Sequence, residues 1–213
     1  MGSRANPAIP KLEEILHDNS KECPLSLNQY LPLDILQKEV NVHSVLAYIQ
    51  SVIRTPTTIS NHDLAEKIIQ QAKGVFATLI FVGRENAIEE LLSEGLTDKH
   101  LPLSHRGSGA DRNLLCCRDG SKIFETFRDW RVTEVNNFLR EQWRVQAPVF
   151  DIAGSHFTLG RDCALPLEPG RELIGTTGFS RVYKCALYPS HYRMISQVSV
   201  VLSYHSLDLM SLY

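Results

Sequence analysis

The sequence lacks the features that place a chain in a membrane or on a nucleic acid. Its longest apolar run, 75–82, is too short to span a bilayer, and no apolar segment follows the first residues as in a secretory signal peptide. Neither sign of charge dominates, because the sequence contains 22 Lys and Arg and 24 Asp and Glu, which gives a net charge of −2. A chain with so little net charge has no overall positive potential to attract a nucleic acid or an anionic lipid surface. We expect an intracellular protein, cytoplasmic or nuclear, with no nucleic-acid partner and no membrane partner.

The cysteines lack the spacing of a metal site or a disulfide framework. They are odd in number and contain no C-x-x-C pair: Cys23, Cys116, Cys117, Cys163 and Cys185. Adjacent cysteines cannot readily direct both sulfur atoms to one tetrahedral metal ion. The pattern predicts free thiols and no metal site. Of the eight histidines, His62 lies beside a helix start, and His156, His191 and His205 are isolated from carboxylates; we expect all eight to be exposed or to cap helices.

The composition is that of a globular protein, with 43% hydrophobic residues, and the chain divides into unlike parts. Scattered prolines predict a flexible tail over 1–31, with a helical turn or two at most. Apolar residues at helical spacing then predict a helical region over 32–145 that forms the only substantial core, including Ile69 and Phe76. Pro and Gly punctuate a linker over 146–170. The expected fold class is α+β, mainly α, a helical amino-terminal region followed by a short antiparallel hairpin.

Start and stop signals bound the helices of the helical region. Ser60 stands three residues before Asp63, as an N-terminal cap does, and Gly95 stands where a helix ends. A further amphipathic helix is expected over 132–144. The segment 104–120 is rich in Gly, Ser, Arg and Asp, and we expect it to be an exposed loop.

The stretch IGTTGFSRVYKC, residues 174–185, lies between two runs that alternate as strands do. A protein-kinase glycine loop has the pattern G-x-G-x-x-G-x-V between antiparallel strands, with glycines that let backbone N–H groups approach phosphate. Gly175 and Val182 fit its ends, whereas Thr177 and Ser180 replace its second and third glycines. A plain hairpin turn explains the same residues. The sequence contains no P-loop, and a strand instead of a helix follows the turn, which excludes a Rossmann motif.

A succession of short motifs surrounds this stretch: Gln142-Trp143, Ala147-Pro148-Val149-Phe150, His156, Leu165-Pro166-Leu167, Gly178-Phe179-Ser180-Arg181-Val182-Tyr183-Lys184 and Pro189-Ser190-His191. It resembles a family of fungal proteins in which a helical amino-terminal region precedes a protein kinase domain. The family has glycine at the place of Thr177 and phenylalanine at the place of Leu167. The resemblance implies that 171–190 is the first hairpin of a kinase amino-terminal lobe. It also implies serine/threonine phosphorylation with ATP and Mg²⁺, with nucleotide contacts from Ile174, Gly175, Thr176, Thr177, Gly178, Phe179, Ser180 and Val182.

The residues that perform phosphoryl transfer in such an enzyme are missing. No lysine follows Lys184, and neither H-R-D nor D-F-G occurs. Kinases take from these motifs the phosphate-binding lysine, the catalytic aspartate and a magnesium ligand. We therefore expect a truncated kinase-like chain with no catalytic residue, no metal ligand and no tightly bound ATP or Mg²⁺. The alternative is a helical interaction module that binds a protein partner through its helical region and carries an incidental hairpin.

The segment 191–213 is expected to be a divergent tail. From Ser196 onward it holds five serines, four leucines and a single charged residue, Asp208. Gln197-Val198-Ser199 is what CAG-GTG-AGT encodes, the usual boundary of an exon and an intron. This favours the hypothesis that the tail is translated intron or a frame-altered end. The alternative is a genuine tail in which 198–204 adds a third strand to the hairpin.

Overall fold

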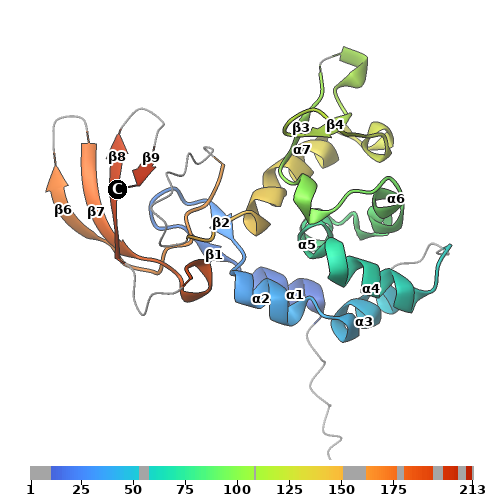
Figure 1. Cartoon of the computed structure of the whole chain (residues 1–213), viewed down its shortest axis with the longest axis horizontal. Coiled ribbons are helices and arrows are strands. Elements are labelled where there is room, and N and C mark those ends of the chain that lie inside the picture. Colours follow the sequence, from blue (N-terminus) through green and yellow to red (C-terminus); the bar gives the residue numbers. More distant parts are fainter. Residues whose placement is uncertain are drawn as a thin grey trace, which may run out of the picture.

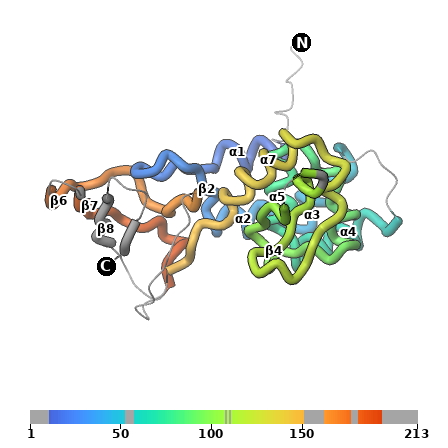
Figure 2. Tube along the Cα trace, turned by 90° about the horizontal axis from the view of Figure 1, so that it is seen from above, coloured from blue at the N-terminus to red at the C-terminus, as the bar shows by residue number. Residues whose placement is uncertain are grey.

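The computed structural model describes residues 11–52, 58–107, 109–150, 162–176, 180–193, 199–205 and 210–212. In these ranges the α-helices lie before residue 146 and the largest sheet lies after residue 171, so the fold is α+β and mainly α, as predicted. Figure 1 shows the helices on one side and the sheet on the other, with β1 and β2 between them. The view from above in Figure 2 shows the same elongated arrangement. No helix in the described ranges has the length and apolar character needed to cross a membrane.

Seven α-helices form the body of the described structure: α1 (Leu12–Asp18), α2 (Leu33–Glu39), α3 (Val42–Val52), α4 (Asn61–Gln71), α5 (Lys73–Val82), α6 (Ile88–Ser93) and α7 (Val132–Glu141). Six short 3₁₀ helices accompany them: η1 (Glu85–Ala87), η2 (Asp98–His100), η3 (Gly109–Asp111), η4 (Thr126–Asp129), η5 (Gln142–Val145) and η6 (Pro189–His191). Helix α5 is central, and α1, α2, α4, α6 and α7 contact it. Its residues from 74 to 80 are all buried, which explains the long apolar run.

The predicted helix signals are largely confirmed. The Ser60 hydroxyl accepts a hydrogen bond from the backbone N–H of Asp63 at the start of α4. Phe76 is fully buried in α5, as expected. Ile69 is only partly buried, and its neighbour Ile68 is the fully buried residue of that turn. Two consecutive isoleucines gave the sequence pattern no means to decide which of them faces the core.

The described part of 1–31, residues 11–31, contains the expected helical turn or two as α1, but it packs against both cores instead of forming a tail. Leu12 and Leu16 lie one turn apart on α1 and are buried in the main core. The chain then forms β1 (Lys21–Glu22), which pairs with β2 (Gln29–Tyr30) in an antiparallel ribbon. Tyr30 has no exposed surface. A strand of two residues is too short to show an alternation of apolar and polar side chains, so the sequence pattern could not indicate β1 and β2.

The interpretation of 104–120 as an exposed loop is wrong. This segment contains most of β3 (Leu103–His105) and all of β4 (Leu115–Cys117), which form an antiparallel sheet with β5 (Ile123–Phe124). All three residues of β4 are buried. The strands are short and the polar residues between them dominate the composition, which hid the strands.

A second core contradicts the predicted single core, and the described part of 146–170 packs into it as an extended arm. The second core contains Cys23, Tyr30, Phe150, Ala164, Leu165, Leu167, Cys185 and Leu187. In the described part of the linker, Leu165 is 1% exposed, and the backbone N–H of Glu168 donates to the carbonyl of Ala186 at 2.9 Å. The prolines of this segment favour extended backbone, and that backbone lies against the end of the sheet. Residues 151–161 lie outside the described residues.

Candidate functional site

The predicted hairpin is present, and its strands are β6 (Glu172–Thr176) and β7 (Ser180–Ala186). They pair antiparallel, with Gly175 opposite Val182 and Thr176 opposite Arg181. Three of the predicted nucleotide-contact residues, Thr177, Gly178 and Phe179, lie outside the described residues. Ser180 begins β7. The described strands therefore bring Gly175, Thr176 and Val182 to the same end of the hairpin, next to the turn.

Strand β6 contains an irregularity at the first glycine of the motif. The register shifts between Leu173 and Gly175, so Ile174 is an extra residue, as in a β-bulge. A β-carbon added at Gly175 would lie 3.8 Å from the Cβ of Val182, which is an ordinary contact. The hairpin itself therefore does not require glycine at this position.

The two faces of β7 have different surroundings. Cys185 belongs to the second core and Tyr183 packs against it. Because side chains alternate along a strand, Val182 and Lys184 lie on the other face. Val182 is half-buried there and Lys184 is exposed. Lys184 is opposite Glu172 in the register, in agreement with its interpretation as a solvated strand lysine.

A third strand, β8 (Ser199–His205), pairs antiparallel with the whole of β7, and β9 (Met210–Leu212) pairs with β8. The sheet order is β6-β7-β8-β9. A strand expected over 198–204 is present as β8, one residue later, and it does not decide between a genuine tail and a translated intron. The strand occupies the position beside β7, but its sequence SVVLSYH offers no lysine for a phosphate.

The hairpin can offer backbone groups and apolar surface, but not phosphoryl-transfer chemistry. Its described strands carry a single carboxylate, Glu172, which is exposed and opposite Lys184. Mg²⁺ is held in proteins by carboxylates together with substrate phosphates in octahedral geometry. One exposed carboxylate beside a lysine does not fit that donor set.

Hydrogen bonds from both halves of the chain hold the hairpin to the helical body. The His191 Nε2 atom accepts a bond from the backbone N–H of Leu33 at 3.1 Å, so its proton lies on Nδ1, 3.0 Å from the carbonyl of Pro148. The Tyr30 hydroxyl donates to the carbonyl of Leu167 at 3.0 Å. His191 is 2% exposed, so the expectation of an exposed or capping histidine is wrong here. Burial lowers the pKa of His191, which favours the neutral ring that these bonds need.

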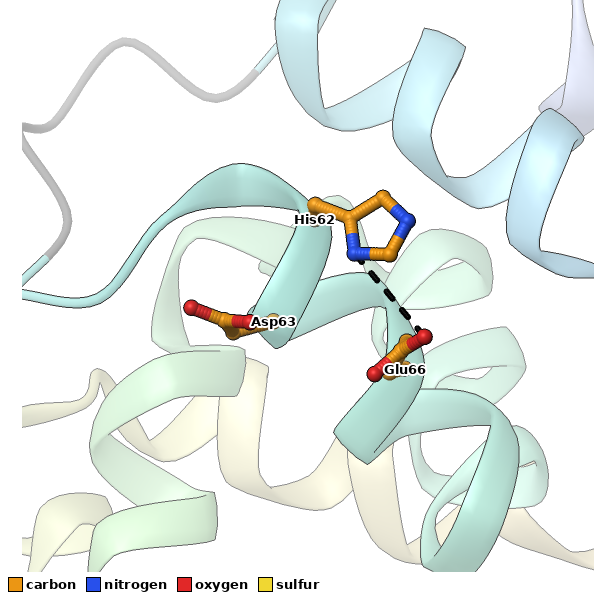
Figure 3. Close-up of side chains that lie close together, drawn as sticks. All are labelled: His62, Asp63 and Glu66. Atoms are coloured by element: carbon orange, nitrogen blue, oxygen red, sulfur yellow. Dashed lines mark ion pairs between the residues drawn. The ribbon is translucent and has the colours of Figure 1, made fainter.

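A group of possible metal ligands lies at the start of α4, where the sequence suggested only a helix cap. His62, Asp63 and Glu66 are exposed, with ligand atoms within 4.8 Å of one another. Figure 3 shows His62 and Glu66 facing each other across one turn, with 3.8 Å between Nδ1 and Oε1. An Asp63 carboxylate oxygen accepts a bond from the hydroxyl of Ser60 at 2.7 Å. These contacts are those of a capped helix start, and Asp63 is already used in the cap.

The thiols are free, as predicted, and all five cysteines are buried. Cys163 and Cys185 lie near the second core, and burial raises the pKa of both thiols, to about 11 for Cys163. Such thiols stay protonated at neutral pH, and the thiolate is the reactive form. The cysteines of this region are therefore packing residues.

Two cavities lie in the helical part of the described structure. One, of about 280 Å³, lies between the β1–β2 turn and η5, beside Leu27, Trp143 and Arg144. The other, of about 230 Å³, lies beside Arg84, Thr126 and Trp130. Of the quoted motifs only Gln142-Trp143 contributes a residue, Trp143, because each cavity is assembled from segments far apart along the chain.

Comparisons of the chain with models of protein families, with curated proteins and with solved structures found no match. The resemblance to fungal kinase domain-containing proteins therefore stays a prediction that rests on the motifs within 142–191.

Proposed function

We propose that the chain is a kinase-related protein that carries a glycine-loop hairpin without the catalytic residues, and that it acts by binding and not by phosphoryl transfer. The observation that carries the proposal is the register of the hairpin. Gly175 lies opposite Val182 beside the turn, and an antiparallel third strand lies against β7. A kinase glycine loop has the same order of strands and the same end residues.

The glycine at 175 adds support because the fold does not explain it. An alanine there would meet Val182 at an ordinary distance, and the described backbone gives Gly175 no positive φ. A residue without a side chain is useful where a ligand must approach the backbone closely. Val182 lies half-buried on the face turned away from the second core, where it can contact such a ligand.

The alternative, a protein partner bound by the helical region, has less support. Among the described residues, the large apolar side chains that are exposed are Leu27, Leu173 and Ile174. None of these lies within 32–145, whereas two of them lie on β6. The described side chains therefore give little support to an apolar docking surface on the helical body.

The test is a nuclear magnetic resonance titration of the isotope-labelled chain with ATP, up to about 10 mM because weak binding is expected without charged ligands. We expect shifts at the amides of Gly175 and Val182 with a millimolar Kd, and no transfer of phosphate to a protein substrate. Restoring the loop glycines, T177G together with S180G, should tighten binding at least about fivefold if close phosphate approach limits it. Adenosine, which lacks phosphate, is the control ligand and should not respond to the substitutions.

Shifts confined to the helical body, or no shifts in either protein, would show that the hairpin is incidental. Micromolar binding by the unchanged chain would also contradict the proposal, since it would require charged contacts that the hairpin lacks.

A further inference from the structure

We propose that the contact between α2 and η6 is a latch that opens when the ring of His191 gains a second proton. Acid would then loosen the sheet from the helical body while both stay folded. His191 ends η6, which follows β7 in the chain, and Leu33 begins α2 in the helical body. The two elements pack against each other, and the side chain that joins them is 2% exposed. This behaviour does not depend on nucleotide binding by the hairpin.

The hydrogen bonds of His191 require a neutral ring. A backbone N–H can only donate, so the Nε2 atom, 3.1 Å from the backbone nitrogen of Leu33, must offer a lone pair. A carbonyl oxygen can only accept, so the proton of the ring lies on Nδ1, 3.0 Å from the carbonyl of Pro148. A second proton, on Nε2, would place two donors against each other without an acceptor. The closed contact therefore excludes the protonated ring.

The N–H group of Leu33 depends on His191 because its own helix offers it no acceptor. The N–H groups of the first turn of a helix have no carbonyl of a preceding turn to bond. Pro32, at the cap position of α2, forms no side-chain cap either. The imidazole supplies the missing acceptor from a segment 158 residues away along the chain. An unpaired buried group costs free energy, so a protonated ring favours a state in which the start of α2 reaches water.

The groups around His191 keep the latch closed at neutral pH. The rings of Tyr30 on β2 and Tyr188 beside η6 pack edge-on against it, with 5.7 and 6.5 Å between ring centres. Burial raises the pKa of both phenols, so both stay uncharged. The segment 147–150, which carries the carbonyl acceptor, has no titratable side chain. Burial lowers the pKa of His191, and the negative charge of Asp34, the second residue of α2, opposes this in part.

Contacts that do not depend on the proton keep the opening local. The backbone N–H of Phe150 donates to the carbonyl of His191 at 2.8 Å, and the N–H of Arg193 donates to the carbonyl of Phe150 at 3.0 Å. The Tyr30 hydroxyl donates to the carbonyl of Leu167 at 3.0 Å. Protonation of the imidazole removes none of these bonds. The sheet therefore stays attached to β2 and to the segment before it, and only its contact with α2 opens.

The pH dependence of the opening follows from the two states. In the open state the ring is in water and gains a proton near the ordinary histidine pKa of about 6.5, whereas the closed state excludes that proton. The closed state is therefore fully favoured above this pH and loses its advantage as pH falls below it. Each unit of pH below about 6.5 should raise the ratio of open to closed chains about tenfold.

The experiment measures hydrogen exchange of the whole isotope-labelled chain by nuclear magnetic resonance, from about pH 7.5 to about pH 5.5. The amide of Leu33 reports the latch, and the amide of Phe76 in α5 reports global unfolding, each corrected for its intrinsic exchange rate. We expect the protection of Leu33 to fall about tenfold, mostly below about pH 6.5, while Phe76 keeps its protection. The proposal is overturned if Leu33 keeps its protection throughout, or if Phe76 loses protection in parallel.

Three variants assign the response to one ring. H191Q cannot gain a proton, so the protection of Leu33 should show no dependence on pH. D34N removes a charge that favours the protonated ring, so the ring signal of His191 should titrate at a lower pH than in the unchanged chain. H43Q replaces an exposed histidine of α3 and is the matched control, in which the response of Leu33 should be unchanged. A response that persists in H191Q, or that disappears in H43Q, would overturn the proposal.

Discussion

The helical body and the sheet are stabilised in different ways. The core of the body is drawn from α1 to α7 and the short sheet β3-β4-β5, all between residues 12 and 138. The second core takes residues from both ends of the described chain, since Cys23 and Tyr30 pack with Phe150, Leu165 and Cys185. The body therefore carries its own core, whereas β6 and β7 depend on a segment more than a hundred residues earlier. Closing so long a loop costs chain entropy that only the contacts of the second core can offset.

The largest effect is expected from a cavity in the main core. Phe76→Ala should lower the free energy of unfolding by about 3–5 kcal/mol, because Phe76 is fully buried in the central helix. Ile69→Ala is the matched control and should cost less than half as much, since Ile69 is only partly buried. Urea denaturation of both variants measures the difference. Equal losses would show that α4 and α5 are packed differently from this structure.

A cavity in the second core should act locally. Leu165→Ala should cost about 2–4 kcal/mol in the stability of the sheet, because Leu165 is 1% exposed. Hydrogen exchange is expected to speed up at the amides of β7 while α5 keeps its protection. If the amides of α5 lose the same protection, the two cores unfold as one and the contrast between them is wrong.

Acid should weaken the junction of the two regions through His191. Its folded-state pKa is lowered by burial, so below about pH 6.5 the unfolded chain binds a proton more readily than the folded chain does. The stability that neutral His191 supplies is thus complete above that pH and is lost as pH falls towards the lowered pKa. Asp34, whose negative charge raises the pKa of His191, limits the shift.

The measurement is the melting temperature of the unchanged chain and of His191→Gln between pH 7.5 and 5, a range of about one unit above and below the ordinary histidine pKa. The variant should be less stable at pH 7.5, because Leu33 and Pro148 lose their partner, and its melting temperature should fall less on acidification. Parallel falls in both proteins would assign the acid sensitivity to other groups.

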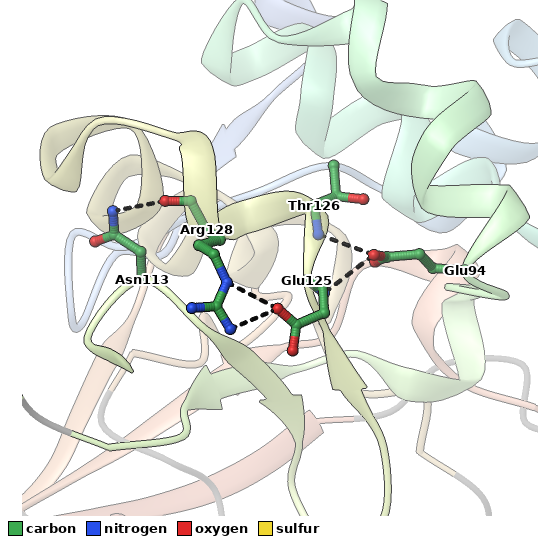
Figure 4. Close-up of polar contacts among 5 residues, drawn as sticks. All are labelled: Glu94, Asn113, Glu125, Thr126 and Arg128. Carbon is green, nitrogen blue, oxygen red and sulfur yellow. Dashed lines mark hydrogen bonds and ion pairs between the residues drawn. The ribbon is translucent and has the colours of Figure 1, made fainter. Parts of the chain in front are cut away.

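The smallest effect is expected in the helical body at Thr126. Thr126→Val removes a buried hydroxyl that has no described partner and keeps the side-chain volume, so stability should stay within about 1 kcal/mol of the unchanged chain or rise. The substitution leaves in place the backbone N–H of residue 126, which donates to Glu94 at 2.9 Å (Figure 4). Thermal unfolding measures the change. A loss of more than about 2 kcal/mol would mean that the hydroxyl is hydrogen-bonded in solution.

The sequence predicted the long elements correctly and missed the short ones. Helix α4 and its cap at Ser60 and Asp63, and the hairpin β6–β7, were predicted because their signals extend over several residues. The pairs β1–β2 and β3–β4 were missed, since strands of two or three residues show no period. The motif fitted Gly175 and Val182 to the ends of a glycine loop, and only the structure showed that they lie opposite each other; nucleotide contact by them stays a prediction.

The sequence by itself determined the mainly helical class, the position of the central apolar helix, the hairpin and the absence of the strings H-R-D and D-F-G, because each of these depends on residue types or on local spacing. Only the tertiary structure decided that Tyr30, Leu165 and Cys185 share a second core, that His191 is a buried neutral acceptor, and that Thr126 lines a cavity with Glu90 and Asp129. These features join segments that are distant in the chain. Such contacts are selected by burial and hydrogen-bond pairing in the folded state, and no local pattern encodes them.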